Sequence, residues 1–489
     1  MITLFRTDQI YALDQIKNVL ATHIRQLPDK VSPIGVPLKI LRYEFPCEPI
    51  DILTWLHNQR VPCKIYWSDR RRDRFSRRST IGSVGIPTER KRASEKTCPC
   101  EIGGIGVADA IAGSGSVDHA EVFAYMEDRL AADNPDLRYY GGMNFQGAAN
   151  DPDWQSFGSY QFIIPRFELL KDVDQTILAF NIAFKDVDKD NVAAILKELD
   201  AIDFSSTTTY RPPPKVLRRA DFPDRQEWEA AFAKTKGANG RFRYDKIVLA
   251  RKSVFDFDVY IDPSALLKHL KDKTPQCFHF CFQTDKTTAF LGASPERLYK
   301  RSEDRIETEA VAGTSPRGAN HEEEAALEQE LLNCSKNALE HRYVVDAIRE
   351  ALGELCTDVR TDAKARLVKL EGGQHLVTRL ESVLRPGVSD SAIIARLHPT
   401  PAVAGCPKDE VLAAIPELEP FSRGWYAGPV GYVGYDQSEF AVAIRSALVN
   451  HDKLSLYAGA GIVEGSTAEG EWNEIETKIG NFIEVFNKR

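Results

Sequence analysis

Two carboxylates and an amine stand at regular spacing near the C-terminus, where together they could bind a metal ion and an acidic ligand. Glu471, Glu474 and Lys478 lie three and four residues apart, which places them along one face of a helix. The simpler interpretation is a Glu-to-Lys ion pair on the surface. The preceding Gly459–Gly461 segment predicts a turn whose backbone a ligand can approach closely, and this favours a binding site.

A helix must present these side chains, and the apolar pattern predicts one over residues 468–487. Large apolar residues recur there every three or four positions and form one continuous stripe, which consists of Trp472, Ile475, Ile479, Phe482 and Phe486. The two carboxylates and the lysine follow one edge of this stripe. Packing of the helix would therefore also position the polar site.

Two further cations stand in or beside apolar runs. Arg445 follows Ala441–Ile444 and is predicted to lie in a strand. A buried guanidinium needs an anionic partner, and its planar fork fits a carboxylate. Lys246 begins the apolar run Ile247–Ala250, and a lysine there can act as a base only when desolvation or nearby positive charge lowers its pKa. An ordinary lysine at the end of a strand is the alternative.

Composition limits the classes of function. The 489 residues are 43% apolar, enough for a large core. The net charge of −8 argues against a general nucleic-acid surface, and the chain has no apolar run long enough to span a bilayer. No secretory signal is visible, and the nine cysteines are an odd, scattered set typical of reduced thiols. We therefore predict a cytoplasmic protein.

The positions of the predicted elements indicate an α+β fold. Apolar runs at residues 246–250, 278–282 and 289–292 predict strands, whereas residues 192–199, 321–352 and 468–487 predict helices. Strands come in runs with helices grouped between them, which is typical of α+β proteins. The prolines of Tyr210–Pro214 predict an extended linker.

Three stretches identify a family. They are Glu307–Gly318, which contains a small-residue turn and a Pro-Arg-Gly exit, His398–Ala402, which reads His-Pro-Thr-Pro-Ala, and Tyr457–Gly465. Together they resemble the chorismate-utilising enzymes, the family of anthranilate synthase component I, and are most similar to the isochorismate synthases within it. The resemblance implies a large two-layer α/β sandwich of antiparallel sheets flanked by helices, with the active site between the sheets.

The same resemblance implies catalytic and metal-binding roles. Lys246 matches the family's general base and Glu296 its general acid, which must stay protonated near neutral pH. Glu340 and Glu474 match ligands of Mg²⁺, with Glu471 close by. Such a site suits the cation, because Mg²⁺ takes one or two carboxylates and completes its octahedron with waters and substrate oxygens.

The resemblance also implies a set of residues that contact chorismate. Arginine, lysine and backbone amides would bind its carboxylates, and the remaining members would form the pocket wall. The set comprises Thr314, His398, Ala402, Tyr426, Arg445, Gly459, Ala460, Gly461 and Lys478.

Lys246 and Ala312 favour water over ammonia as the nucleophile. Relatives that add ammonia usually lack a lysine at the first position, and some carry a nucleophilic lysine at the second. The predicted reaction adds water at C2 of chorismate and removes the C4 hydroxyl. Salicylate synthases share the apparatus and then eliminate pyruvate, so that activity is the alternative. A non-catalytic protein that binds an acidic partner through an Arg-rich loop is the third.

The predicted organisation has two parts. Residues 1–100 form an N-terminal region of unassigned role, which includes the Arg-rich loop at 69–97. That loop is predicted to be solvated, because Phe75 is its only aromatic residue. Residues 101–489 form the catalytic domain, with the motifs in 240–489, and pack as one compact unit with the N-terminal region. The predicted partner is chorismate, without nucleic acid or membrane, and the predicted assembly is a monomer or weak dimer.

Overall fold

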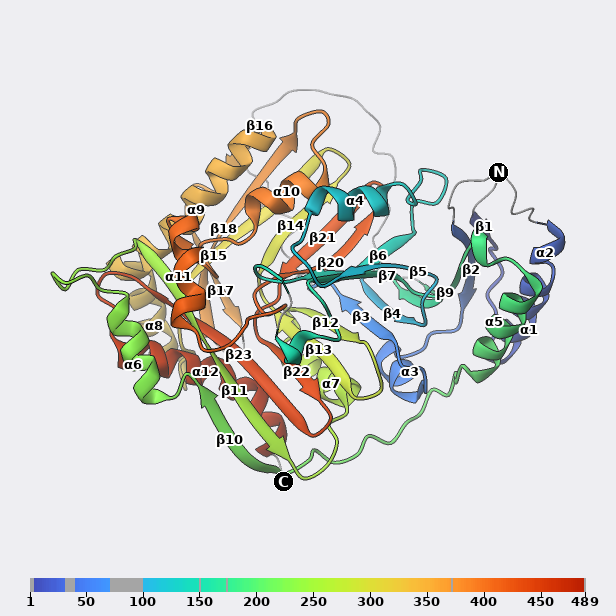
Figure 1. Cartoon of the computed structure of the whole chain (residues 1–489), viewed down its shortest axis with the longest axis horizontal. Coiled ribbons are helices and arrows are strands. Elements are labelled where there is room, and N and C mark those ends of the chain that lie inside the picture. The colour runs from blue at the N-terminus through green and yellow to red at the C-terminus, as the bar shows by residue number, and fades with distance from the viewer. Residues whose placement is uncertain are drawn as a thin grey trace.

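Two large sheets dominate the fold, and helices cover their outer faces (Figure 1). The computed structural model describes residues 4–30, 40–70, 100–148, 151–172, 175–370 and 373–487. Within these ranges neighbouring strands pair antiparallel, apart from the parallel pair β1 and β2. The predicted α+β class, with antiparallel sheets flanked by helices, is confirmed.

The first sheet has 13 strands within the described residues. Its strands, in spatial order, are β1 (Leu4–Arg6), β2 (Ile40–Cys47), β9 (Thr176–Ala183), β8 (Phe167–Lys171), β4 (Glu101–Ile105), β3 (Lys64–Ser68), β12 (Phe278–Gln283), β13 (Thr288–Ser294), β22 (Ser446–Asn450), β23 (Lys453–Ile462), β11 (Lys246–Phe257) and β10 (Val216–Phe222), while β19 (Gly405–Cys406) pairs with β11.

The second sheet has 10 strands in the same ranges. Its order is β16 (Cys356–Thr361), β18 (Gly373–Leu384), β15 (Arg305–Ser315), β14 (Arg297–Ser302), β21 (Gln437–Val442), β20 (Pro429–Gly434), β6 (Arg138–Met143), β7 (Tyr160–Ile164) and β5 (Asp109–Gly113), while β17 (Arg366–Leu370) pairs with β18.

The helices pack mainly on the sheets. Among them α9 lies against β15 and β18, α12 against β23, and α7 against β12 and β13. The helices are α1 (Leu13–Arg25), α2 (Leu27–Lys30), α3 (Ile52–Asn58), α4 (His119–Glu127), α5 (Lys189–Ala201), α6 (Arg225–Lys234), α7 (Pro263–Lys273), α8 (His321–Asn333), α9 (Ser335–Leu355), α10 (Asp390–Leu397), α11 (Lys408–Leu418) and α12 (Ala468–Asn487).

Aromatic side chains join the two sheets in the core. The ring of Trp67 from β3 meets that of Tyr432 from β20 edge-on, with 6.2 Å between the ring centroids. Phe282 from β12 meets Trp425, which precedes β20, in the same way at 5.7 Å. Such edge-to-face contacts are favourable beyond the area they bury. They join the two sheets through the core.

The predicted elements agree with the structure except at three places in the second half of the chain, one of which is Arg445, beyond the end of β21. The helix expected over residues 321–352 is two helices, because Cys334 adopts extended backbone angles between α8 and α9. Neither glycine nor proline marks that break. The turn expected at Gly459–Gly461 is instead the end of strand β23, paired with β11. Helix α12 has the predicted bounds, and Ile475, Ile479 and Phe482 of its stripe are buried.

The N-terminal region contributes strands to the interior of the first sheet. Strand β3 pairs with β12 on one side and with β4 on the other. Residues 202–215 carry neither helix nor strand, and they run along the lower edge of the molecule from α5 to β10 (Figure 1). This is the predicted linker. The division of the chain at residue 100 stays a prediction, and residues 71–97 of the Arg-rich loop lie outside the described residues.

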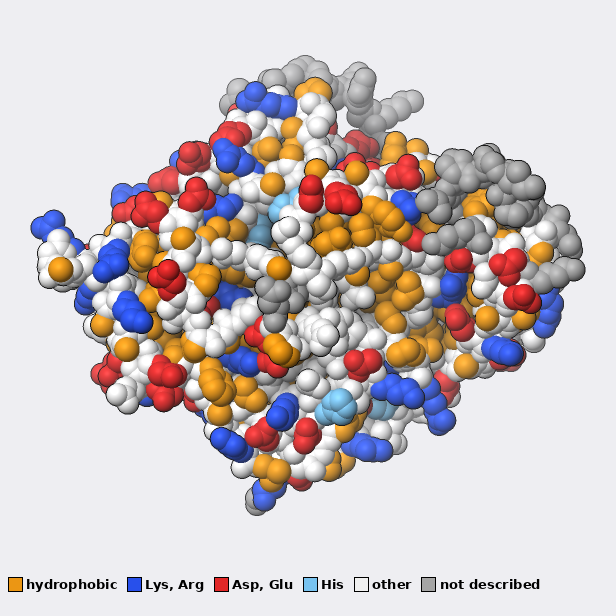
Figure 2. All heavy atoms as spheres, viewed as in Figure 1, with side chains coloured by type: hydrophobic (Ala, Val, Ile, Leu, Met, Phe, Trp, Pro, Cys, Tyr) orange, Lys and Arg blue, Asp and Glu red, His pale blue; other side chains and the backbone are white. Residues whose placement is uncertain are grey.

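The surface carries charges of both signs. On the face shown in Figure 2, basic and acidic side chains are interspersed, and apolar side chains gather in small groups between them. None of the helices in the described part of the chain is long and apolar enough to cross a membrane.

Candidate active site

A cavity between the two sheets collects most of the predicted site residues. Strands β11 and β23 of the first sheet, β15 and β18 of the second, and helices α9 and α12 all contribute to its wall. The predicted residues that line it are Glu296, Thr314, Glu340, Ala402, Tyr426, Arg445, Gly459, Gly461, Glu474 and Lys478. Lys246, Ala460 and Glu471 stand behind this lining, whereas His398 lies elsewhere.

Lys246 is the first residue of β11 and is fully buried. Its Nζ lies 3.0 Å from Oε1 of Glu340 on helix α9, so the two form an ion pair. Gly461 of the adjacent strand allows this approach. A Cβ atom at that position would lie 2.6 Å from Glu340 Oε1 and 2.9 Å from Lys246 Cε, so a side chain there would displace one of the two partners.

Glu296 is a buried carboxyl in the connection between β13 and β14. Burial raises its pKa to about 8, against the lowering effects of Lys246 and of the Thr400 hydroxyl 3.5 Å from Oε1. The negative charge of Glu309 raises it further. Glu296 is therefore mostly protonated at neutral pH and can donate a proton.

The carboxylates of α12 face lysines. Glu474 lies at the cavity wall, while Glu471 is buried behind it. Burial and the charge of Glu474 raise the pKa of Glu471. Each of the three predicted metal carboxylates pairs with one lysine: Glu340 with Lys246 at 3.0 Å, Glu471 with Lys336 at 2.8 Å, and Glu474 with Lys478 at 2.7 Å.

Arg445 lies beyond the strand in which it was predicted. Strand β21 ends at Val442, and Arg445 has a left-handed φ of 50° in the connection to β22. A non-glycine residue in that region is uncommon and is held there by its surroundings. One nitrogen, Nη2, lies 2.8 Å from Nε2 of His375. The other, Nη1, is buried without an oxygen or nitrogen partner among the described residues, beside the Cys277 thiol.

His375 is a cavity residue that the sequence argument missed. It stands on β18, and its Nδ1 lies 3.1 Å from the Thr314 hydroxyl. Burial and the charges of Arg445 and Lys478 lower its pKa well below the usual value, so the ring is neutral. Since the guanidinium can only donate, Nε2 accepts from Arg445 and Nδ1 donates to Thr314. The sequence offered one indication of this role, because His375 stands in an apolar strand at a position that faces the interior.

His398 does not reach the cavity wall. Its Nε2 lies 3.0 Å from the Phe145 carbonyl oxygen, and its ring packs edge-on against the Phe145 ring. Burial lowers the pKa of His398 to about 3. The side chain is therefore a neutral hydrogen-bond donor to the backbone, whereas Thr400 and Ala402 of the same motif face Glu296 and the cavity respectively.

Because successive residues of a strand face opposite sides, Ala460 faces away from the cavity that its neighbours line. Gly459 and Gly461 line the cavity, and Ala460 points to the opposite face of β23. A Cβ on Gly459 would lie 3.1 Å from the Tyr426 hydroxyl. Tyr426 lines the cavity and stacks on Tyr457 at 5.4 Å. The small residues thus leave room beside the tyrosine for a ligand.

The donor set suits a hard cation. Glu340 and Glu474 offer carboxylate oxygens to the same cavity, and Mg²⁺ requires no more than one or two such groups from the protein. Among the residues that the structure describes, three or more His, Cys, Asp or Glu side chains nowhere gather into a metal cluster. A cation here would share its carboxylates with the lysines and draw further oxygens from water and substrate.

Comparison with known proteins gives the family. A family model described as "Chorismate binding enzyme" matches residues 37–487. The chain is 33% identical over 469 residues to isochorismate synthase 2, chloroplastic, of Arabidopsis thaliana, covering 91% of this chain and 80% of that protein. It is 34% identical over 363 residues to the isochorismate synthase MenF of Bacillus subtilis, covering 73% and 76%.

A solved structure extends the match to the whole fold. MenF, the menaquinone-specific isochorismate synthase of Escherichia coli, superposes with a TM-score of 0.78 at 25% sequence identity, covering 97% of this chain and 100% of that one. The family motifs, the two-sheet architecture and these matches agree. The chain belongs to the chorismate binding enzyme family.

Proposed function

We propose that this protein is an isochorismate synthase, an isomerase that adds water at C2 of chorismate and removes the C4 hydroxyl. The observation that carries the proposal is the presence of a buried lysine and a buried, protonated carboxyl beside one cavity. Lys246 and Glu296 are close enough for the lysine to influence the pKa of the carboxyl. The similarity to several isochorismate synthases supports the same reaction.

The reaction requires one proton to be removed and another to be supplied. Lys246, in its neutral form, would take a proton from the incoming water, and Glu296 would give one to the departing hydroxyl. Atoms balance because one water enters and one leaves. Since the two groups exchange roles in the reverse direction, the same residues interconvert chorismate and isochorismate.

The remaining cavity residues would hold the substrate. Arg445 offers a fork for one carboxylate, and His375 keeps that fork oriented through its hydrogen bond to Nη2. Lys478 would neutralise a second carboxylate, as it already lies between Glu474 and the Gly459 carbonyl oxygen. The stacked ring of Tyr426 would cover the substrate from one side.

Magnesium is the proposed cofactor. Glu340 and Glu474 would hold it, with Glu471 orienting the helix edge behind them. When bound, the ion would neutralise the part of the substrate's carboxylate charge that Arg445 and Lys478 do not neutralise. Placement in the cytoplasm, which the composition supports, and a monomeric or weakly dimeric state are further proposals.

We expect the purified protein with Mg²⁺ to convert chorismate to isochorismate, and isochorismate to chorismate, until both reactions reach the same mixture. The reason is that we assign none of the described residues of the cavity to breaking the enolpyruvyl ether. Chromatography of both time courses at neutral pH measures the products. Stoichiometric salicylate and pyruvate, growing with enzyme concentration, would instead establish a salicylate synthase.

Replacing Lys246 with alanine should lower the rate by about 10² to 10⁴, because it removes the proposed base. Lys252→Ala is the matched control. This lysine stands on the same strand and pairs with Asp153 outside the cavity, so its loss should leave turnover near that of the parent. Initial rates and thermal melting would be measured for both variants. Near-normal turnover in a folded Lys246→Ala protein excludes the lysine from the mechanism.

Glu340→Gln and Glu474→Gln should each raise the Mg²⁺ concentration for half-maximal activity by ~10-fold or more, since each removes a charged ligand. Glu471→Gln should have a smaller effect. The exposed Glu469 of the same helix supplies the control variant Glu469→Gln. Calorimetric Mg²⁺ titration provides a second readout, and unchanged binding in either of the first two variants removes that residue from the metal site.

A further inference from the structure

The segment that carries Glu296 is a crossing between the two sheets. Strand β13 of the first sheet ends at Ser294, and β14 of the second begins at Arg297. Pro295 and Glu296 alone span the connection. Any displacement of this two-residue link would move the carboxyl relative to the cavity.

Hydrogen bonds from Val442 of β21 and from Ser294 hold the backbone of the link on one side. The amide of Val442 donates to the Glu296 carbonyl oxygen at 3.1 Å. The Ser294 hydroxyl donates to the Val442 carbonyl oxygen and accepts from the Glu296 amide. These bonds fix the backbone of Glu296 but leave the Pro295 carbonyl free for another donor.

Arg70 supplies that donor from the N-terminal region, just beyond the end of β3. Its Nη1 donates to the Pro295 carbonyl oxygen at 3.1 Å, and its Nη2 to Oε1 of Glu309 at 2.6 Å. The guanidinium lies over the Phe278 ring, 4.9 Å from the centroid. Only 20% of the side chain is exposed, so this first arginine of the Arg-rich segment is packed against the protein.

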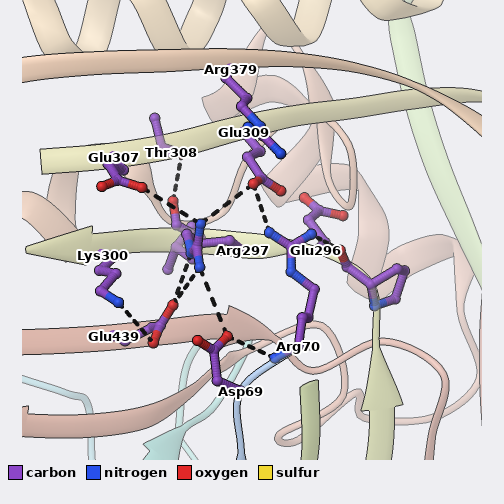
Figure 3. Close-up of polar contacts among 12 residues, drawn as sticks. Asp69, Arg70, Glu296, Arg297, Lys300, Glu307, Thr308, Glu309, Arg379 and Glu439 are labelled. Atoms are coloured by element: carbon purple, nitrogen blue, oxygen red, sulfur yellow. Dashed lines mark hydrogen bonds and ion pairs between the residues drawn. The ribbon is translucent and has the colours of Figure 1, made fainter. Parts of the chain in front are cut away.

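Arg70 belongs to a buried charge network directly behind the link (Figure 3). Arg297 occupies its centre and pairs with Glu439 at 2.7 Å and with Glu309 at 3.4 Å. Asp69 lies 3.9 Å from Arg297. In Figure 3 the Arg70 side chain extends between Asp69 and Glu309, beside Glu296. Charges this deeply buried need partners in fixed positions, which makes the network a rigid support.

The network also reaches Glu296 electrostatically. The groups that act on its carboxyl are Lys246 from β11, Lys478 from α12, Glu309 from β15 and the Thr400 hydroxyl. Among these, only the negative charge of Glu309 raises the pKa of Glu296, as burial does, and so favours the protonated carboxyl. Arg70 and Arg297 both neutralise Glu309 and lower its pKa against its burial. Without Arg70, Arg297 would still keep Glu309 ionised, but less positive charge would offset the negative charge of Glu309. That charge would then act more strongly on Glu296.

We infer that Arg70 is a positioning residue for Glu296, which it holds in place through the Pro295 carbonyl and through Glu309. Two donors of one planar group join the link to the second sheet, a geometry that lysine cannot reproduce. The inference rests on the proposed role of Glu296. It gives the N-terminal region, whose role the motifs leave open, a part in building the active site.

The test replaces Arg70 with glutamine and with lysine in the full chain. Arg70→Gln should lower kcat by ~10- to 100-fold, because small displacements of a reacting group are costly, while the KM for chorismate changes by about twofold or less. The decline of kcat above pH about 8, where Glu296 loses its proton, should move to higher pH. Arg70→Lys keeps the charge, so it should restore the pH profile and only part of kcat.

Arg385→Gln is the matched control. Arg385 also donates to two acceptors, the backbone carbonyl oxygens of Cys356 and Gly353, away from the cavity. Its loss should lower the melting temperature without moving kcat or the pH profile. If Arg70→Gln behaves like this control, the role is only structural and the inference is wrong. If Arg70→Gln does not fold, Arg70→Lys provides the test. A wild-type kcat in Arg70→Lys would then show that the inference is wrong. Absence of isochorismate from the parent enzyme would refute the proposed function instead.

Discussion

Charge compensation in a buried cavity is the constraint on which this structure depends. The space between the sheets holds cations and carboxyls that could not be buried alone, and the lysines there meet carboxylates. Lys246 meets Glu340 only because Gly461 leaves no side chain between them. Glu296 lacks such an ion pair and stays protonated. A lysine amine and a protonated carboxyl therefore stand beside one cavity, and these are the two groups that the proposed hydroxyl exchange uses.

The fold brings these groups together from distant parts of the chain. Strand β11 supplies the amine, the crossing between β13 and β14 supplies the acid, and helices α9 and α12 supply the carboxylates. Strand β3, inserted between β4 and β12, brings Arg70 to the back of the crossing. The two sheets act as a rigid frame, and the active site occupies their shared interior and not a surface loop.

Local sequence patterns predicted most of the elements, and the family resemblance predicted most of the cavity residues, but neither predicted the features that tertiary contacts decide. The apolar period of α12 and the apolar run after Lys246 were sufficient for those elements. The break at Cys334 has no glycine or proline to mark it, and the left-handed backbone of Arg445 has no local cause. Likewise, His375 and Arg70 acquire their contacts only when remote strands meet. The motif containing His398 was located correctly, although that side chain turns to Phe145.

The most direct test of the account follows the oxygen atoms. Unlabelled chorismate would be converted by the enzyme in water enriched with a heavy oxygen isotope, and the ring hydroxyls would be examined by mass spectrometry. Addition of solvent water, with Lys246 as base and Glu296 as acid, predicts labelled hydroxyl at C2 of isochorismate and, through reversal, at C4 of recovered chorismate. Isochorismate that carries only the original oxygen would show direct transfer of the hydroxyl and would contradict the mechanism.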